Sequence, residues 1–181
     1  YITRFEKGKD YPIYTRKKDS LEAPEEILFD VNEMAKGHSY YNLRGISVSP
    51  DNTMVSFGVD TLSRRKYTIY IKNLVTGKLM QEVIPLTTGG ATWANDNKTL
   101  FYSKKDEQTL RSNKIFKHTL GQNSADDVNV FTEQDETFNT FVYKTKSKKY
   151  IVIGSSSTLS SEYQILDADT PNKEFKIFQP R

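Results

Sequence analysis

Ser49-Pro50-Asp51-Asn52 leads into the apolar run Met54-Val55-Ser56-Phe57, and Ala94-Asn95-Asp96-Asn97 leads into Thr99-Leu100-Phe101-Tyr102. Asp51 and Asp96 are 45 residues apart. A third, looser copy runs Lys146-Ser147-Lys148-Lys149 into Tyr150-Ile151-Val152-Ile153, 51 residues later when Lys148 is aligned with Asn97. Repeats of about 40 to 50 residues with several short strands in each are typical of β-propeller blades.

The polar half of each copy has the chemistry of a tight turn. Asp and Asn side chains accept hydrogen bonds from nearby backbone N–H groups and tolerate a left-handed backbone. We therefore interpret Asp51 and Asp96 as turn residues rather than as catalytic acids or metal ligands.

The repeat divides the chain into four-stranded units. In the first complete unit the pattern predicts strands at residues 43–48, 53–59, 67–73 and 79–85, and the next unit begins with a strand at 91–93. Tyr67, Ile69 and Ile71 fall on one face of their strand, and Tyr70 falls on the other. The predicted fold class is all-β: a partial β-propeller with three near-complete four-stranded blades, part of a preceding blade and one short helix. The predicted units are the last three strands of a first blade (1–30), a short helix and connection (31–38), and three blades (39–86, 87–136 and 137–181), the last with a truncated end.

Composition agrees with a globular sheet protein and excludes several function classes. The 181 residues include 11 Tyr and 10 Phe, which favour strands, and the formal net charge is only +3. Short basic groups such as Arg64-Arg65-Lys66 are interpreted as solvated turns, so no nucleic-acid partner is predicted. There is no cysteine, which excludes disulfides and thiolate metal sites and suits a reducing compartment.

The chain carries no targeting or membrane signal. No apolar run approaches the roughly 18 residues that span a bilayer, so no membrane partner is expected. Because the sequence already alternates as a strand from Tyr1, it resembles a piece cut from a longer protein. We expect a cytoplasmic location, with the periplasm as the alternative.

No residue pattern for catalysis, metal binding or cofactor binding emerges. The only histidines are His38, after the predicted helix, and His118, within a strand, and both are interpreted as structural or exposed. Residues 154–158 lack the closing glycine of a Gly-x-Ser-x-Gly nucleophile elbow. The acidic pairs lack calcium-loop spacing. Trp93 is expected to pack between blades rather than to stack on a ligand. The sequence thus predicts no catalytic, metal or cofactor residue and no cofactor.

Several phrases together resemble the oligopeptidase B-like members of the prolyl oligopeptidase family of serine peptidases. The phrases are Tyr1-Ile2-Thr3-Arg4-Phe5-Glu6-Lys7-Gly8-Lys9-Asp10-Tyr11-Pro12-Ile13-Tyr14, Ala23-Pro24-Glu25-Glu26-Ile27-Leu28-Phe29-Asp30-Val31-Asn32, Ser47-Val48-Ser49-Pro50-Asp51 and Thr92-Trp93-Ala94-Asn95-Asp96. The resemblance covers most of the chain, is strongest in the first 105 residues and is weak after Asp126. Ser-Pro-Asp alone is common in propellers, whereas the order of strand, turn and Ala-Pro-Glu-Glu-Ile-Leu-Phe-Asp before a short helix is more specific.

The resemblance implies a two-domain protein in which the propeller covers a C-terminal α/β-hydrolase domain with a Ser-Asp-His triad. Such proteins cleave oligopeptides after Lys or Arg, and the propeller gates and size-selects access to the site. No triad residue has a counterpart in this chain, so no peptidase activity is expected of it alone. Arg44 and Thr92 lie on first strands and are candidates to line the central channel, with packing between blades as the alternative.

Two further expectations concern partners. The open faces of a part-propeller present apolar surface, so we expect the isolated chain to self-associate.

The alternative function is a propeller that binds proteins or ligands with no hydrolase partner, and a Gly-x-Ser-x-Gly elbow further along the protein would distinguish the two. A propeller enzyme with its site on the blades needs convergent carboxylates or histidines, which two histidines make improbable.

Overall fold

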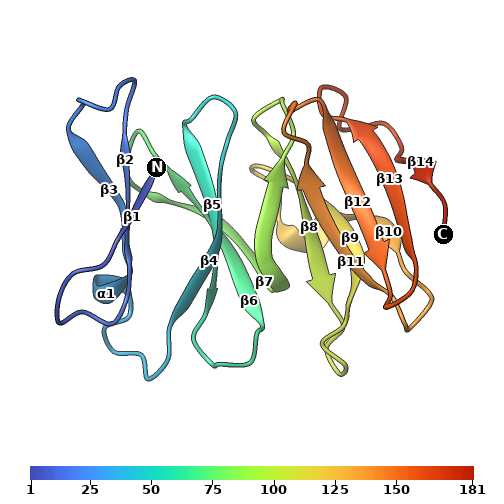
Figure 1. The fold of residues 1–181 in the computed structure, drawn as a ribbon, viewed down its shortest axis with the longest axis horizontal. Helices are drawn as coiled ribbons and strands as arrows, with labels where there is room; N and C mark the ends of the chain where they lie inside the picture. The colour runs from blue at the N-terminus through green and yellow to red at the C-terminus, as the bar shows by residue number, and fades with distance from the viewer.

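The computed structural model describes all residues 1–181, and its regular secondary structure is almost entirely β-strand. Every strand pair is antiparallel, in sheets of three, seven and four strands. The sheets stand side by side along the long axis (Figure 1). The strands are β1 (Ile2–Arg4), β2 (Ile13–Lys17), β3 (Glu25–Asp30), β4 (Asn42–Val48), β5 (Met54–Asp60), β6 (Tyr67–Asn73), β7 (Leu79–Trp93), β8 (Thr99–Lys105), β9 (Ser112–Thr119), β10 (Val128–Thr132), β11 (Asn139–Lys144), β12 (Tyr150–Ser156), β13 (Ser161–Asp167) and β14 (Lys176–Gln179). The all-β prediction is confirmed.

Successive side chains point to opposite faces of a β-strand, so a strand with apolar residues at consecutive positions packs on both of its faces. On β6, Ile69 and Ile71 are fully buried on one side, and Tyr70 packs against a different cluster on the other, as the sequence predicts. This two-sided burial lets the sheets stack as successive layers.

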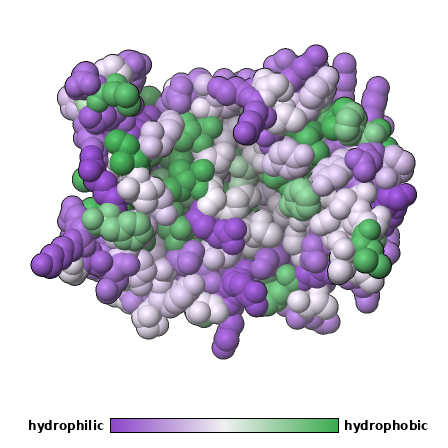
Figure 2. Space-filling view, in the orientation of Figure 1, coloured by the Kyte–Doolittle hydropathy of each residue, from purple (hydrophilic) through white to green (hydrophobic).

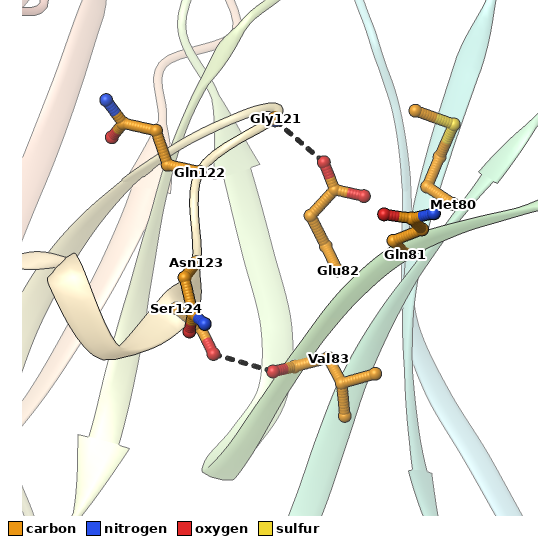
Figure 3. A pocket seen from close by; sticks show the side chains of 8 residues that line it. All are labelled: Met80, Gln81, Glu82, Val83, Gly121, Gln122, Asn123 and Ser124. Atoms are coloured by element: carbon orange, nitrogen blue, oxygen red, sulfur yellow. Dashed lines mark hydrogen bonds between the residues drawn. The ribbon is translucent and has the colours of Figure 1, made fainter.

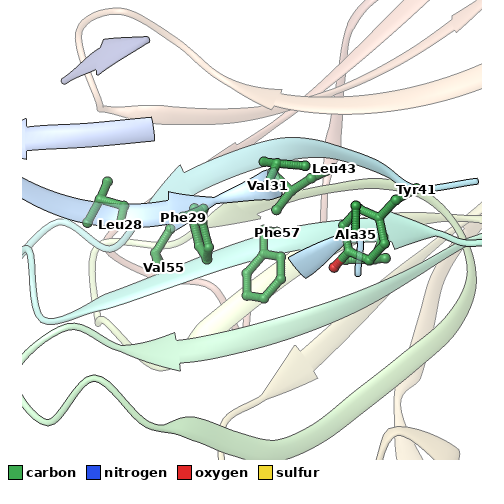
Figure 4. Close-up of a cluster of buried hydrophobic side chains, with 9 residues drawn as sticks. Leu28, Phe29, Val31, Ala35, Tyr41, Leu43, Val55 and Phe57 are labelled. Carbon is green, nitrogen blue, oxygen red and sulfur yellow. The ribbon is translucent and has the colours of Figure 1, made fainter. Parts of the chain in front are cut away.

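Three apolar clusters fill the spaces between successive blades, because the seven-stranded sheet contributes two blades that share β7. The first joins β3 and α1 to β4 and β5 (Figure 4) and consists of Leu28, Phe29, Val31, Ala35, Tyr41, Leu43, Val55, Phe57 and Val59. The second consists of Ile69, Ile71, Ile84, Ala91, Trp93, Leu100 and Tyr102, and the third of Ala94, Phe101, Ile115, Ile151, Ile153, Leu166 and Ala168. Each interface therefore has its own core, as expected of stacked blades.

The repeated turns have the same backbone geometry in all three copies. Asn52, Asn97 and Lys148 adopt φ of 59°, 59° and 61°, at the positions that the sequence repeat aligns. Asp51 accepts hydrogen bonds from the Thr53 backbone N–H (3.0 Å) and hydroxyl (2.9 Å). The turn interpretation of the repeat is thus confirmed.

Strand β7 differs most from the sequence prediction. Two strands, 79–85 and 91–93, were expected with a blade boundary between them, but a single strand of 15 residues runs through both. Its first half pairs with β6 and its second half with β8, and Thr87 pairs with Tyr67 on one side and Lys104 on the other. Positive φ at Leu86 (60°) and Gly89 (94°) lets the strand bend from one partner to the next. The predicted division at residue 86 therefore falls within one strand.

The helical segments are short. Helix α1 (Val31–Met34) begins at Asp30, whose side chain accepts a hydrogen bond from the Asn32 backbone N–H, 3.0 Å away. A 3-10 helix, η1 (Ser124–Asp126), was not predicted. Neither segment has the length and apolarity of a membrane-crossing helix.

Exposed apolar side chains lie at both ends of the stack and also on the middle sheet and its loops. Figure 2 shows hydrophobic patches among the hydrophilic surface at the left and the right of the molecule. The exposed apolar side chains include Ile27 on the first sheet and Phe141, Tyr143 and Phe178 on the last sheet. These are the outer faces of the first and last layers.

Candidate functional site

The innermost strands of the three four-stranded units form the candidate site, because the sequence places Arg44 and Thr92 on them. These strands are β4, the second half of β7, and β11. Strand β4 is irregular: its pairing with β5 shifts register between Arg44 and Ser47, and Gly45 adopts φ of 64°. A bulge of this kind re-aims the side chains on either side of it.

Three glycines bring the backbone of β7 directly onto β4 and β5. A Cβ on Gly45 would lie 2.2 Å from the Gly89 carbonyl oxygen, and a Cβ on Gly58 would lie 2.4 Å from Gly89 Cα. No side chain fits at such distances. The chain can therefore pass from β6 to β8 only because glycine occupies both strands beneath the crossing.

Arg44 lies beside this crossing and is exposed. Its guanidinium carbon is 5.3 Å from the centre of the Tyr67 ring, and the Tyr67 hydroxyl donates to Asn42 Oδ1 (3.2 Å). No carboxylate oxygen lies within 4.0 Å of the guanidinium. Its channel-lining role stays a prediction, but its charge is free to act on a ligand.

Thr92 and Trp93 join their strand to both neighbouring inner strands. Trp93 Nε1 donates to the Ser47 carbonyl oxygen of β4 (2.9 Å), and the Thr92 hydroxyl donates to the Val142 carbonyl oxygen of β11 (3.2 Å). Trp93 is 2% exposed and Thr92 is 9% exposed. Trp93 thus packs between blades as predicted. Thr92 also makes an inter-blade contact, and its proposed place on a channel stays a prediction.

The two histidines occupy the structural and exposed environments that the sequence suggests. His118 is fully buried, with Nδ1 2.7 Å from Asp127 Oδ1, while the Tyr102 hydroxyl donates to Asp127 Oδ2 (2.9 Å). Burial, together with the charge of Asp127 and the hydrogen bond to it, raises the pKa of Tyr102 well above its usual range. His38 is exposed at the end of the α1 segment. Neither ring contacts a serine hydroxyl, so neither forms a nucleophile–base pair.

An arginine and a glutamate that the sequence did not single out organise the loop between β10 and β11. Arg111 donates to the carbonyl oxygens of Phe138 (3.0 Å) and Glu133 (3.2 Å). The Glu133 carboxylate is 4% exposed and binds the Ser155 hydroxyl and Arg181 (2.6 Å). Nothing in the local sequence marks these contacts, because the partners come from separate strands.

A cavity lies in the seam between β7 and the β9–β10 loop (Figure 3). It has a volume of about 510 Å³ and a largely polar lining. Glu82 Oε1 accepts from the Gly121 N–H (2.8 Å), and the Ser124 hydroxyl donates to the Val83 carbonyl oxygen (2.7 Å). These bonds close the seam across the cavity. No three His, Asp or Glu side chains are grouped to hold a metal ion.

Comparison with known proteins matches the whole chain, residues 1–181, to the model of the prolyl oligopeptidase N-terminal β-propeller domain. The chain is 36% identical over its full length to dipeptidyl aminopeptidase BI of Pseudoxanthomonas mexicana and 32% identical to protease 2 of Moraxella lacunata, and covers 27% of each. Oligopeptidase B of Leishmania major superposes with a TM-score of 0.89 at 32% identity, over 99% of this chain and 26% of that one. The chain thus spans about a quarter of the length of these relatives.

Proposed function

Because this chain belongs to the prolyl oligopeptidase family, whose N-terminal β-propeller domain it matches along its whole length, we propose that it gates a serine peptidase site without taking part in the chemistry. In this proposal the propeller covers a C-terminal α/β-hydrolase domain that carries the catalytic triad. It admits oligopeptides and excludes folded proteins. Covering the site also keeps bulk water from the reaction.

The observation that carries the proposal is that the polar side chains with a possible chemical role are either engaged between strands or buried. The Thr92 hydroxyl and Trp93 Nε1, on the inner strand β7, donate to carbonyl groups of neighbouring strands. His118, on β9, is fully buried and has no route to a substrate. These groups do not supply a nucleophile and base, which suits a gate whose chemistry is supplied by another domain.

For the full-length protein we propose cleavage of short peptides after Lys or Arg, as the resemblance to oligopeptidase B implies. A second candidate is removal of dipeptides from the N-terminus, favoured by the 36% identity to a dipeptidyl aminopeptidase. The two differ in their products. Cleavage after an internal Lys yields two fragments set by the position of that Lys, whereas dipeptide removal yields a ladder of products two residues apart.

The test compares the full-length protein with the 181-residue chain on a decapeptide with one internal Lys and on a folded protein with exposed Lys residues. We expect the full-length protein to cleave the peptide and spare the folded protein, and the chain alone to cleave neither. Mass spectrometry of the products distinguishes the two specificities. Hydrolysis by the chain alone, or equal cleavage of the folded protein, contradicts the gating role.

We also propose that the isolated 181-residue chain self-associates through its end faces. Ile177 and Phe178 on β14 are 63% and 70% exposed, and Tyr143 on β11 is 43% exposed. Exposed apolar side chains of this kind favour association. Light scattering across a concentration series should show a rising mean mass, and a constant monomer mass contradicts the proposal.

A further inference from the structure

Three cations gather where two four-stranded units meet. Arg44 comes from β4, Arg65 from the β5–β6 loop and Lys105 from the end of β8. The β5–β6 and β8–β9 loops lie at the same edge of the molecule, at the bottom of Figure 1. The edge that carries the repeated Asp/Asn turns is the opposite one. We call these three residues the basic cluster.

The backbone and one buried acid fix the positions of the basic cluster. Lys105 Nζ donates to the Arg65 carbonyl oxygen (2.8 Å), so the lysine is tied to the neighbouring unit. Asp60 is 1% exposed, and its two carboxylate oxygens accept the N–H groups of Leu62 (2.8 Å) and Arg65 (2.7 Å). Asp60 thus shapes the loop that carries Arg65.

The positive charge of the cluster is not balanced by paired acids. None of its three side chains has a carboxylate oxygen within 4.0 Å. Burial, followed by the charges of Arg65 and Arg44, lowers the pKa of Lys105, and the charge of Asp60 only partly opposes this. Lys105 Nζ is tied to the Arg65 carbonyl oxygen, and Arg44 rests on the ring of Tyr67, two residues further along. The three like charges thus share one region of the surface, where a bound anion is favoured.

The side chain of Arg44 is held in one orientation by its neighbours. Its guanidinium rests on the Tyr67 ring, and its aliphatic chain lies against Gly89, so the side chain is supported along its length. The planar fork of a guanidinium binds a carboxylate through two parallel hydrogen bonds. An exposed arginine held in this way on an inner strand can meet a carboxylate that enters from the inner side of the blades.

We propose that Arg44, Arg65 and Lys105 bind the C-terminal carboxylate of the peptide that the propeller admits. The proposal rests on the proposed peptidase function and adds a reason for its restriction to short peptides. A peptide whose C-terminus must reach a fixed cationic site while its scissile bond reaches the catalytic site can have only a limited length. The basic cluster then acts as a specificity site on the gate rather than as part of the catalytic machinery.

The test uses the full-length protein and a pair of peptides that differ only at the C-terminus, one a free acid and one an amide. Binding is measured by fluorescence anisotropy on versions with a D-residue at the scissile bond, which are not cleaved. We expect the free acid to bind about tenfold more tightly, and Arg44→Gln to abolish that preference, because a charge-assisted hydrogen bond to carboxylate contributes on this scale. Lys105→Gln should reduce the preference in the same way.

Lys78→Gln is the matched control, because Lys78 is an exposed lysine at the opposite edge of the same unit. Lys78→Gln should leave the preference for the free acid intact. Arg44→Lys keeps the positive charge and should retain part of that preference. Equal binding of acid and amide by the unaltered protein, or an unchanged preference in both Arg44→Gln and Lys105→Gln, overturns the proposal. The binding measurement is independent of turnover. An inactive protein that still prefers the acid refutes the peptidase function alone, and an active protein without the preference refutes the carboxylate site alone.

Discussion

Gly58→Ala should strongly destabilise the fold, although it adds only one methyl group to the middle of a strand. The new Cβ would lie 2.4 Å from Gly89 Cα and 2.3 Å from the Gly89 carbonyl oxygen. Carbon atoms in contact are normally about 3.5 to 4.0 Å apart, so one backbone must move by about 1 Å. Overpacking ordinarily costs about 1–3 kcal/mol. Because the obstacle is backbone rather than a flexible side chain, we expect a loss of about 3 kcal/mol or more.

Gly90→Ala is the control for this substitution. Gly90 neighbours the crossing, but its Cβ would meet only Gly45 Cα, at 3.8 Å, which is an ordinary contact. Replacing glycine with alanine lowers the conformational entropy of the unfolded chain. We therefore expect Gly90→Ala to be as stable as the unaltered chain or about 0.5 kcal/mol more stable. The pair therefore separates the close approach from the general effect of replacing glycine.

The assay is urea unfolding of the 181-residue chain followed by the fluorescence of Trp93. Trp93 is the single tryptophan and is 2% exposed, so its emission reports on this interface. We expect a much lower urea midpoint for Gly58→Ala with an unchanged slope. A midpoint within experimental error of the unaltered chain would refute the reasoning, as would equal losses in the two variants.

Three further predictions follow from the same contacts. Trp93→Phe removes the hydrogen bond to the Ser47 carbonyl and should cost about 1–3 kcal/mol in urea unfolding, and unchanged stability would show that this bond does not hold the blades together. Burial acts to raise the pKa of Asp96, but hydrogen bonds within its turn outweigh burial and leave the pKa below the usual value, so the ionised group stabilises the fold. That stability should be lost as pH falls below about 4, and Asp96→Asn should flatten the acid limb of a plot of urea midpoint against pH. His118→Ala leaves the buried Asp127 carboxylate with only the Tyr102 hydroxyl as a side-chain partner and should cost about 3 kcal/mol in urea unfolding. Peptidase activity per folded full-length molecule should be unchanged, and lost activity at full stability would instead make His118 catalytic.

The sequence alone predicts the turns and strands because their signals are local. A turn of this kind needs one side chain that accepts hydrogen bonds from nearby N–H groups and one residue with positive φ. The two residues stand close together in the sequence, as Asp51 and Asn52 do. Even Lys148, which lacks the Asn of the other copies, is aligned correctly by the apolar run that follows it. The burial alternation on β6 is equally local.

The contacts that shape the candidate site could not be predicted, because they join distant residues. In the sequence Gly58 is an ordinary strand glycine and Gly89 lies between two predicted strands, and only the fold shows that the backbone at Gly89 crosses Gly58. The continuity of β7 escaped prediction because Gly89-Gly90 reads locally as a break. Of the basic cluster, the sequence suggests a solvated turn for Arg65 and the channel wall for Arg44, and it gives no sign that Arg65 and Lys105 meet.

The continuity of β7 has a mechanical consequence for a ring built of such blades. Residues 42–132 form one sheet of seven hydrogen-bonded strands, and the crossing at Gly89 clamps its centre. Its boundaries with the first and last sheets, at residues 31–41 and 133–138, are spanned by side-chain packing and short connections instead. If the ring parts during substrate entry, the compliant joints are these two boundaries, and the central pair of blades moves as one stiff plate.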